Sequence, residues 1–173
     1  MVFWFAACSA AIVWLVFQSP AFDYRLVMAG SLLGLVELPF GPGPFQSLSL
    51  SVLVLGAVMV GTIGRRLSRR KWLGVPIGMF LHLVLNGAWS SHRVFWWPLF
   101  GIELPGQRAM VIDRGVWSVV LEAAGVLVGI WLWGEFGFSD RGRRQRFLRT
   151  GQLDRSFVGA RRQIANQDTE SQP

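Results

Sequence analysis

Four long apolar segments, separated by short polar or glycine- and proline-rich stretches, dominate this chain. A helix needs about 20 predominantly apolar residues to cross a bilayer, and each segment approaches that length. The four are Val2–Phe17, Phe45–Gly64, Trp72–Ser90 and Gly115–Phe138. A fifth segment, Arg25–Leu38, is shorter and carries Glu37, so it either spans at a tilt or re-enters. The pattern predicts an all-α, polytopic membrane helix bundle of about five spans.

Composition and charge agree with this class. The 173 residues are 52% hydrophobic, and the net charge of +7 is concentrated in two blocks. One block is Arg65–Lys71, and the other follows the last apolar segment. Basic blocks can bind nucleic acid, but those that flank apolar spans more often face the cytoplasm, so no nucleic-acid partner is expected. We therefore predict an external N-terminus, an internal C-terminus, a bundle over residues 1–138 and a basic cytoplasmic tail, largely disordered, over 139–173.

The apolar segment Trp72–Ser90 contains a histidine and an amide one helical turn apart, His82 and Asn86. At about 1.5 Å per residue they lie about 15 and 21 Å from its start, at or beyond the midplane. Glu37, Gln46 and Glu122 fall in the same outer half by the same reasoning. Polar side chains at membrane depth usually line a cavity, a pathway or a packed interface. This level is the best candidate for a site.

Each of these residues also has a structural interpretation. His82 and Asn86 can hydrogen-bond neighbouring helices, and Gln46 can cap one. Glu37 and Glu122 require a partner, a proton or water. His92 falls in the predicted outer loop, where a solvated histidine is the default.

A bound metal would have imidazole, carboxylate and amide ligands, which suits zinc or manganese. The candidate ligands are His82, Glu37, Asn86 and Glu122, and no sequence argument shows that they converge. We expect no resident cofactor, with a divalent metal as the alternative.

Glycine pairs with small-xxx-small spacing recur at Gly30/Gly34, Gly74/Gly78 and Gly125/Gly129. Such pairs let helix backbones approach closely. Packing within one compact bundle is favoured over a dimer seam.

Several short motifs, in order, resemble a known family. They are Asp23-Tyr24-Arg25, Leu38-Pro39-Phe40-Gly41, Gly64-Arg65-Arg66, Phe80-Leu-His82-Leu-Val-Leu-Asn86-Gly87 and Phe95-Trp-Trp-Pro98. Together they resemble the membrane-bound metal-dependent hydrolases, the group that includes the LexA-regulated inner-membrane hydrolases of bacteria. The resemblance is strongest to small actinobacterial members and covers residues 20–135. It implies a multi-pass protein of the bacterial plasma (inner) membrane.

The ligand motifs depart from the family pattern. The family has Pro-Asp-x-x-Asp at the end of its second helix, then His followed by Ser or Thr, then His-x-x-x-Asp. Here the first motif reads Gly34-Leu35-Val36-Glu37, the second Gln46-Ser47, and the third ends in Asn86. We therefore predict a catalytically degenerate member, binding a lipid or a membrane protein partner as an accessory protein of the cell envelope. The alternatives are an active metal-dependent hydrolase of a lipid-linked or phosphoester substrate and a purely structural or assembly subunit.

Overall fold

The computed structural model describes residues 1–17, 23–37, 44–88, 95–98 and 115–152, most of which are helical, with no strand among them. The helices are α1 (Val2–Phe17), α2 (Tyr24–Leu33), the 3-10 turn η1 (Pro44–Gln46), α3 (Leu48–Gly61), α4 (Arg66–Trp72), α5 (Gly74–Asn86), α8 (Val116–Glu135) and α9 (Arg141–Thr150). Within the described ranges, α8 alone is long and apolar enough to cross a membrane by length and composition.

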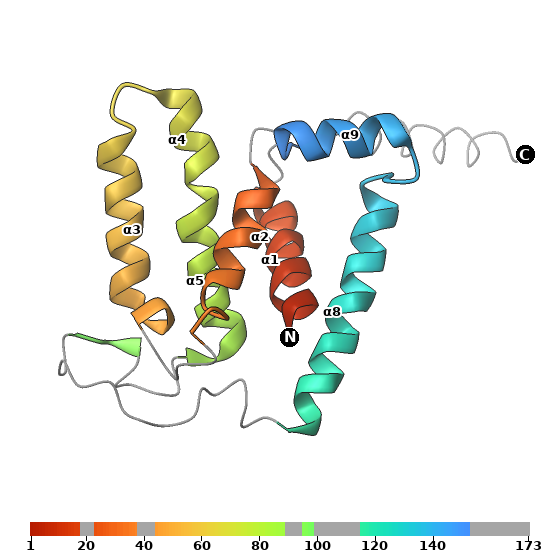
Figure 1. The fold of residues 1–173 in the computed structure, drawn as a ribbon, viewed down its shortest axis with the longest axis horizontal. Helices are drawn as coiled ribbons and strands as arrows, with labels where there is room; N and C mark the ends of the chain where they lie inside the picture. Colours follow the sequence, from red (N-terminus) through yellow and green to blue (C-terminus); the bar gives the residue numbers. More distant parts are fainter. Residues whose placement is uncertain (18–22, 38–43, 89–94, 99–114, 153–173) are drawn as a thin grey trace, which may run out of the picture.

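Figure 1 shows α1, α2 and α5 at the centre of the molecule, with α3 on one side and α8 on the other. The turn between α3 and α4 lies at one end of the bundle, and α9 crosses that same end (Figure 1). The two basic elements, α4 and α9, therefore share one end, as the predicted topology requires. Their position relative to a membrane stays a prediction.

The basic cluster at residues 65–71 forms a helix, which the hydrophobic pattern did not predict. Leu73 keeps right-handed helical backbone angles, and its amide donates to the Arg69 carbonyl (3.0 Å). The Ile77 amide in turn donates to the Leu73 carbonyl (3.3 Å). α4 and α5 thus follow each other with little interruption. The helix stops at Asn86 because Gly87 adopts φ +67°, a left-handed conformation that favours glycine.

The start of the predicted disordered tail also forms a helix, α9. Asp140 caps its first turn by accepting from the Gly142 amide (3.0 Å). Its other end is joined to the start of α2, where Arg25 Nη1 donates to the Leu148 carbonyl (2.7 Å). The apolar periodicity ends near residue 139, so the pattern that identifies buried helices gave no signal here. Residues 153–173, the rest of the predicted tail, lie outside the described residues.

The glycine pairs pack helices within the chain. α2 and α5 run parallel and make the closest contact in the bundle, with Gly30 against the Val75 carbonyl and Gly78 against the Val27 carbonyl. Gly125 on α8 similarly lies against the backbone of Trp4 on α1. A side chain at any of these glycines would overlap backbone atoms of the neighbouring helix. For Gly30, Gly78 and Gly125, the prediction of packing within one bundle is confirmed.

Gly78→Ala is expected to destabilise the bundle, because the added methyl group would overlap the Val27 carbonyl and lie 2.8 Å from the Ser31 amide nitrogen. Overpacking of this kind costs about 1–3 kcal/mol. The matched control is Gly56→Ala on α3, where a Cβ meets nothing within 4 Å. That change should leave the free energy of unfolding equal or raise it by up to about 1 kcal/mol. The free energy of unfolding is measured by denaturant titration in detergent. An equal decrease of this free energy in both variants would contradict the close α2–α5 packing.

Candidate functional site

Most of the buried polar side chains lie on α1, α2, η1, α3 and α5 or directly beside these helices. They come from every one of these elements and are Ser9, Ser31, Glu37, Gln46, Ser47, Ser51, His82 and Asn86. A buried polar group costs free energy unless it is hydrogen-bonded. The bonds that these side chains make therefore indicate what they do.

His82 lies on α5 and is 1% exposed. Its Nδ1 lies 2.7 Å from the carbonyl oxygen of Ser31 on α2. Because a carbonyl oxygen only accepts, Nδ1 carries the proton, and a neutral imidazole then keeps a lone pair on Nε2. Nε2 is buried and finds no hydrogen-bond partner in the described part of the chain. The ring also packs against Phe5, with centroids 4.2 Å apart, and against Gly34.

The carbonyl that His82 binds belongs to the last turn of α2. The last four carbonyls of a helix have no partner within it, and α2 ends at Leu33, so the Ser31 carbonyl is one of these four. Gly34, which follows α2, has no side chain and leaves room for the imidazole; a Cβ there would overlap Nε2. His82 therefore acts as a cap on the carboxyl end of α2, supplied by a neighbouring helix.

Glu37 and Ser47 bind backbone groups at other helix ends. Glu37 Oε1 accepts from the Phe45 amide (3.0 Å), at the start of η1. The Ser47 hydroxyl accepts from the Leu50 amide (3.2 Å) in the first turn of α3. Amides in the first turn of a helix lack partners within it, so both contacts satisfy donors that would otherwise be left unpaired.

Gln46 and Asn86 complete the polar group. Gln46 is 3% exposed, and its Nε2 has no hydrogen-bond partner within the described ranges. Asn86 is fully buried in the last turn of α5, one turn beyond His82. His92, the remaining candidate, lies outside the described residues.

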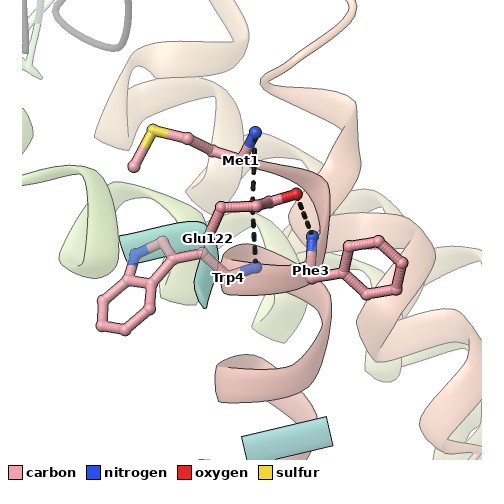
Figure 2. Close-up of polar contacts among 4 residues, drawn as sticks. All are labelled: Met1, Phe3, Trp4 and Glu122. Atoms are coloured by element: carbon pink, nitrogen blue, oxygen red, sulfur yellow. Dashed lines mark hydrogen bonds and ion pairs between the residues drawn. The ribbon is translucent and has the colours of Figure 1, made fainter. Parts of the chain in front are cut away.

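Glu122, on α8, binds the start of α1, as Figure 2 shows. Its two carboxylate oxygens accept from the amides of Phe3 (3.2 Å) and Trp4 (3.4 Å), and Oε2 lies 3.3 Å from the Met1 ammonium. These are the first amides of α1. The carboxylate therefore caps α1 and stabilises the positive end of its dipole.

The arrangement does not make up a metal site among the described residues. His82 alone has a feature of a metal ligand, because ligating histidines usually donate their second ring nitrogen to a carbonyl or carboxylate. A divalent ion also needs charged partners, and the described ranges hold no group of three or more His, Cys, Asp or Glu side chains that could bind one. The Glu122 carboxylate is directed to the start of α1. Among the described residues, His82 is therefore not part of a group of three such ligands.

Comparison with known proteins adds no relative. No family model, no curated protein and no solved structure matches the chain. Any functional conclusion therefore depends on the residues of this chain and their geometry.

Two residues of the site could not be identified in advance from the sequence. Ser31 contributes through its carbonyl, which any residue type has, so no sequence signal could have found it. Gly34 was identified as part of a packing pair, and its contact with the His82 ring was not anticipated. The i, i+4 spacing of His82-x-x-x-Asn86 indicated one shared helix face, which is correct for α5 but says nothing about what that face meets.

His82→Leu should destabilise the protein by about 1–3 kcal/mol, because the buried Ser31 carbonyl loses its donor. His82→Gln should retain part of this stability, since its amide can still donate. The stability of both variants is measured as the free energy of unfolding in detergent. A chelator should leave the stability of the unmodified protein unchanged; a fall to the His82→Leu value on adding chelator would show that His82 stabilises through a metal instead.

Proposed function

We propose that this chain is a multi-pass inner-membrane protein of five spans, built on the scaffold of the membrane-bound metal-dependent hydrolases. Its polar centre fixes the helix ends, and its surface binds lipid or a membrane protein partner. In this proposal the ligand motifs no longer support metal-dependent hydrolysis. The observation that carries it is the apolar, exposed surface of α8.

α8 is 20 residues long, about 30 Å, yet only Gly125 and Leu132 are buried in it. Its outward positions are large and apolar, including Val116, Val119 and Leu127. The core helix of a water-soluble protein would be mostly buried, and a soluble surface rarely exposes a continuous apolar face of this length. α3 supports the same conclusion, because Ser51 is its one buried residue and Leu53 and Val60 are exposed.

The shorter helices fit a bilayer only if their ends are capped by other parts of the chain. α2 is 10 residues long, about 15 Å, so its carboxyl end would lie near the bilayer midplane. α1 begins opposite Glu122, which is about 9 Å along α8 from Val116. Backbone groups in hydrocarbon must be satisfied by the protein itself. His82 and Glu122 meet this requirement at these two ends, which supports a membrane setting.

The hydrogen bonds of these polar side chains also support the proposal that the chain has lost hydrolytic activity. A hydrolytic metal requires several fixed ligands and an open position for water. In this chain Gly34 and Asn86 stand where the resemblance implies carboxylates, and Glu122 binds α1. Glu37 and His82, which remain, bind backbone groups at helix ends. A lipid- or partner-binding accessory protein is therefore the function we propose.

Single cysteines in a Cys8→Ser background test the topology. A membrane-impermeant maleimide applied to intact spheroplasts should label His92→Cys and should reach Ser68→Cys on α4 and Gln145→Cys on α9 only after lysis. Labelling of either inner position in intact spheroplasts, or release of the chain by alkaline carbonate, would contradict the five-span arrangement.

The metal content of the same purified protein tests the lost activity. Zinc and manganese should be far below one ion per chain in the unmodified protein, in His82→Ala and in the control Glu135→Gln alike. Stoichiometric metal that is lost in His82→Ala and kept in Glu135→Gln would instead show an active hydrolase site.

A further inference from the structure

A half-open apolar groove of about 380 Å³ lies between α1, α3 and α5. Its walls are aliphatic and aromatic, with Ile12, Val16, Val52, Leu55, Ile77 and Phe80 among them. Ser51 is the one polar side chain of the lining, and its hydroxyl already donates to the Ser47 carbonyl (3.3 Å). The volume is within the usual range of a small-molecule site. The part of a ligand that enters this groove must therefore be hydrocarbon.

Positive charge lies beyond one end of the groove, on α4. Arg65, Arg66, Arg69, Arg70 and Lys71 are all exposed. No Asp or Glu occurs anywhere in α3, α4 or α5, so these helices supply no carboxylate to neutralise the cluster. Arginine side chains bind phosphate well because they present several donors in a fixed plane.

The arginines and the groove lie on one helix face. Residues three and four apart share a face, and helical geometry continues through Leu73. Arg66, Arg69 and Arg70 are therefore in line with Ile77 and Phe80, whereas Lys71 is turned away. Arg70 precedes Ile77 by seven residues, a rise of about 10 Å. The headgroup region of one leaflet is about 5–8 Å thick, so a phosphate held at Arg70 has its chains in hydrocarbon beside Ile77.

We propose that the groove binds one acyl chain of an anionic phospholipid, with the lipid phosphate held by Arg66, Arg69 and Arg70. The proposal rests on the membrane placement in the proposed function, and it specifies the lipid and the leaflet. The lipid comes from the cytoplasmic leaflet, where α4 lies in that topology. An apolar helix of a second copy would fill the groove equally well, but it would leave the arginines of α4 without counter-ions. Charge complementarity thus favours the lipid.

Photo-crosslinking of the full-length chain in vesicles tests the site. The vesicles are phosphatidylcholine with a trace of a diazirine-labelled acyl-chain probe, either phosphatidylglycerol or phosphatidylcholine. Peptides containing Val52 and Ile77 should be labelled several-fold more by the phosphatidylglycerol probe. Arg66→Gln/Arg69→Gln/Arg70→Gln should abolish this preference. The charge-matched control Arg141→Gln/Arg144→Gln/Arg149→Gln on α9 should keep it.

Val52→Trp tests the groove itself, because it places an indole in the acyl-chain position and should reduce labelling of the Ile77 peptide. Leu53→Trp is the matched control: it is 65% exposed against 57% for Val52, and it does not line the groove. Equal labelling by both probes, or loss of the preference in the α9 control, would overturn the proposal. Labelling of α8 distinguishes failure of this proposal from failure of the membrane placement. If only this proposal fails, both probes still label α8. If the membrane placement is wrong, α8 remains unlabelled.

Discussion

The unpaired backbone groups at helix ends are the constraint on which the rest of this structure depends. Several helices are short, and each leaves amides at one end and carbonyls at the other that lack partners within the helix. In the proposed membrane setting water cannot supply those partners. His82 donates to the end of α2, Glu37 accepts from the start of η1, and Glu122 accepts from the start of α1. The polar residues of the interior thus hold short helices at fixed depths.

The close glycine contact between α2 and α5 makes one of these caps reachable. With Gly30 and Gly78 against the opposing backbones, and no side chain at Gly34, the His82 ring can lie beside the last turn of α2. Because α1, α2 and α5 pack closely at the centre, α3 and α8 lie at the periphery, each with one or two buried residues. The groove between α1, α3 and α5 results from this arrangement, because α3 packs mainly on α5 and leaves its contact with α1 open.

Apolar segment length predicted the all-helical class and the approximate position of most helices, because the hydrophobic signal is local and continuous. It missed α4 and α9, whose sequences are basic and whose helical structure depends on neighbours: α4 runs into α5 through Leu73, and α9 is joined to α2 at Arg25. Polar residues at depth correctly drew attention to His82, Glu37 and Glu122. Their partners are backbone groups, which carry no sequence signal, so spacing alone suggested ligands where the structure has caps.

The protonation of the His82 ring tests most directly whether this residue is a helix cap. The chain has two histidines, so His92→Gln leaves a single one for ¹⁵N labelling. Solid-state NMR in bilayers should show a neutral ring protonated on Nδ1, hydrogen-bonded through that atom, with an unprotonated Nε2 whose shift is unchanged by zinc or by chelator. A ring protonated on Nε2, or an Nε2 resonance that moves when zinc is added, would contradict the cap and support a metal ligand.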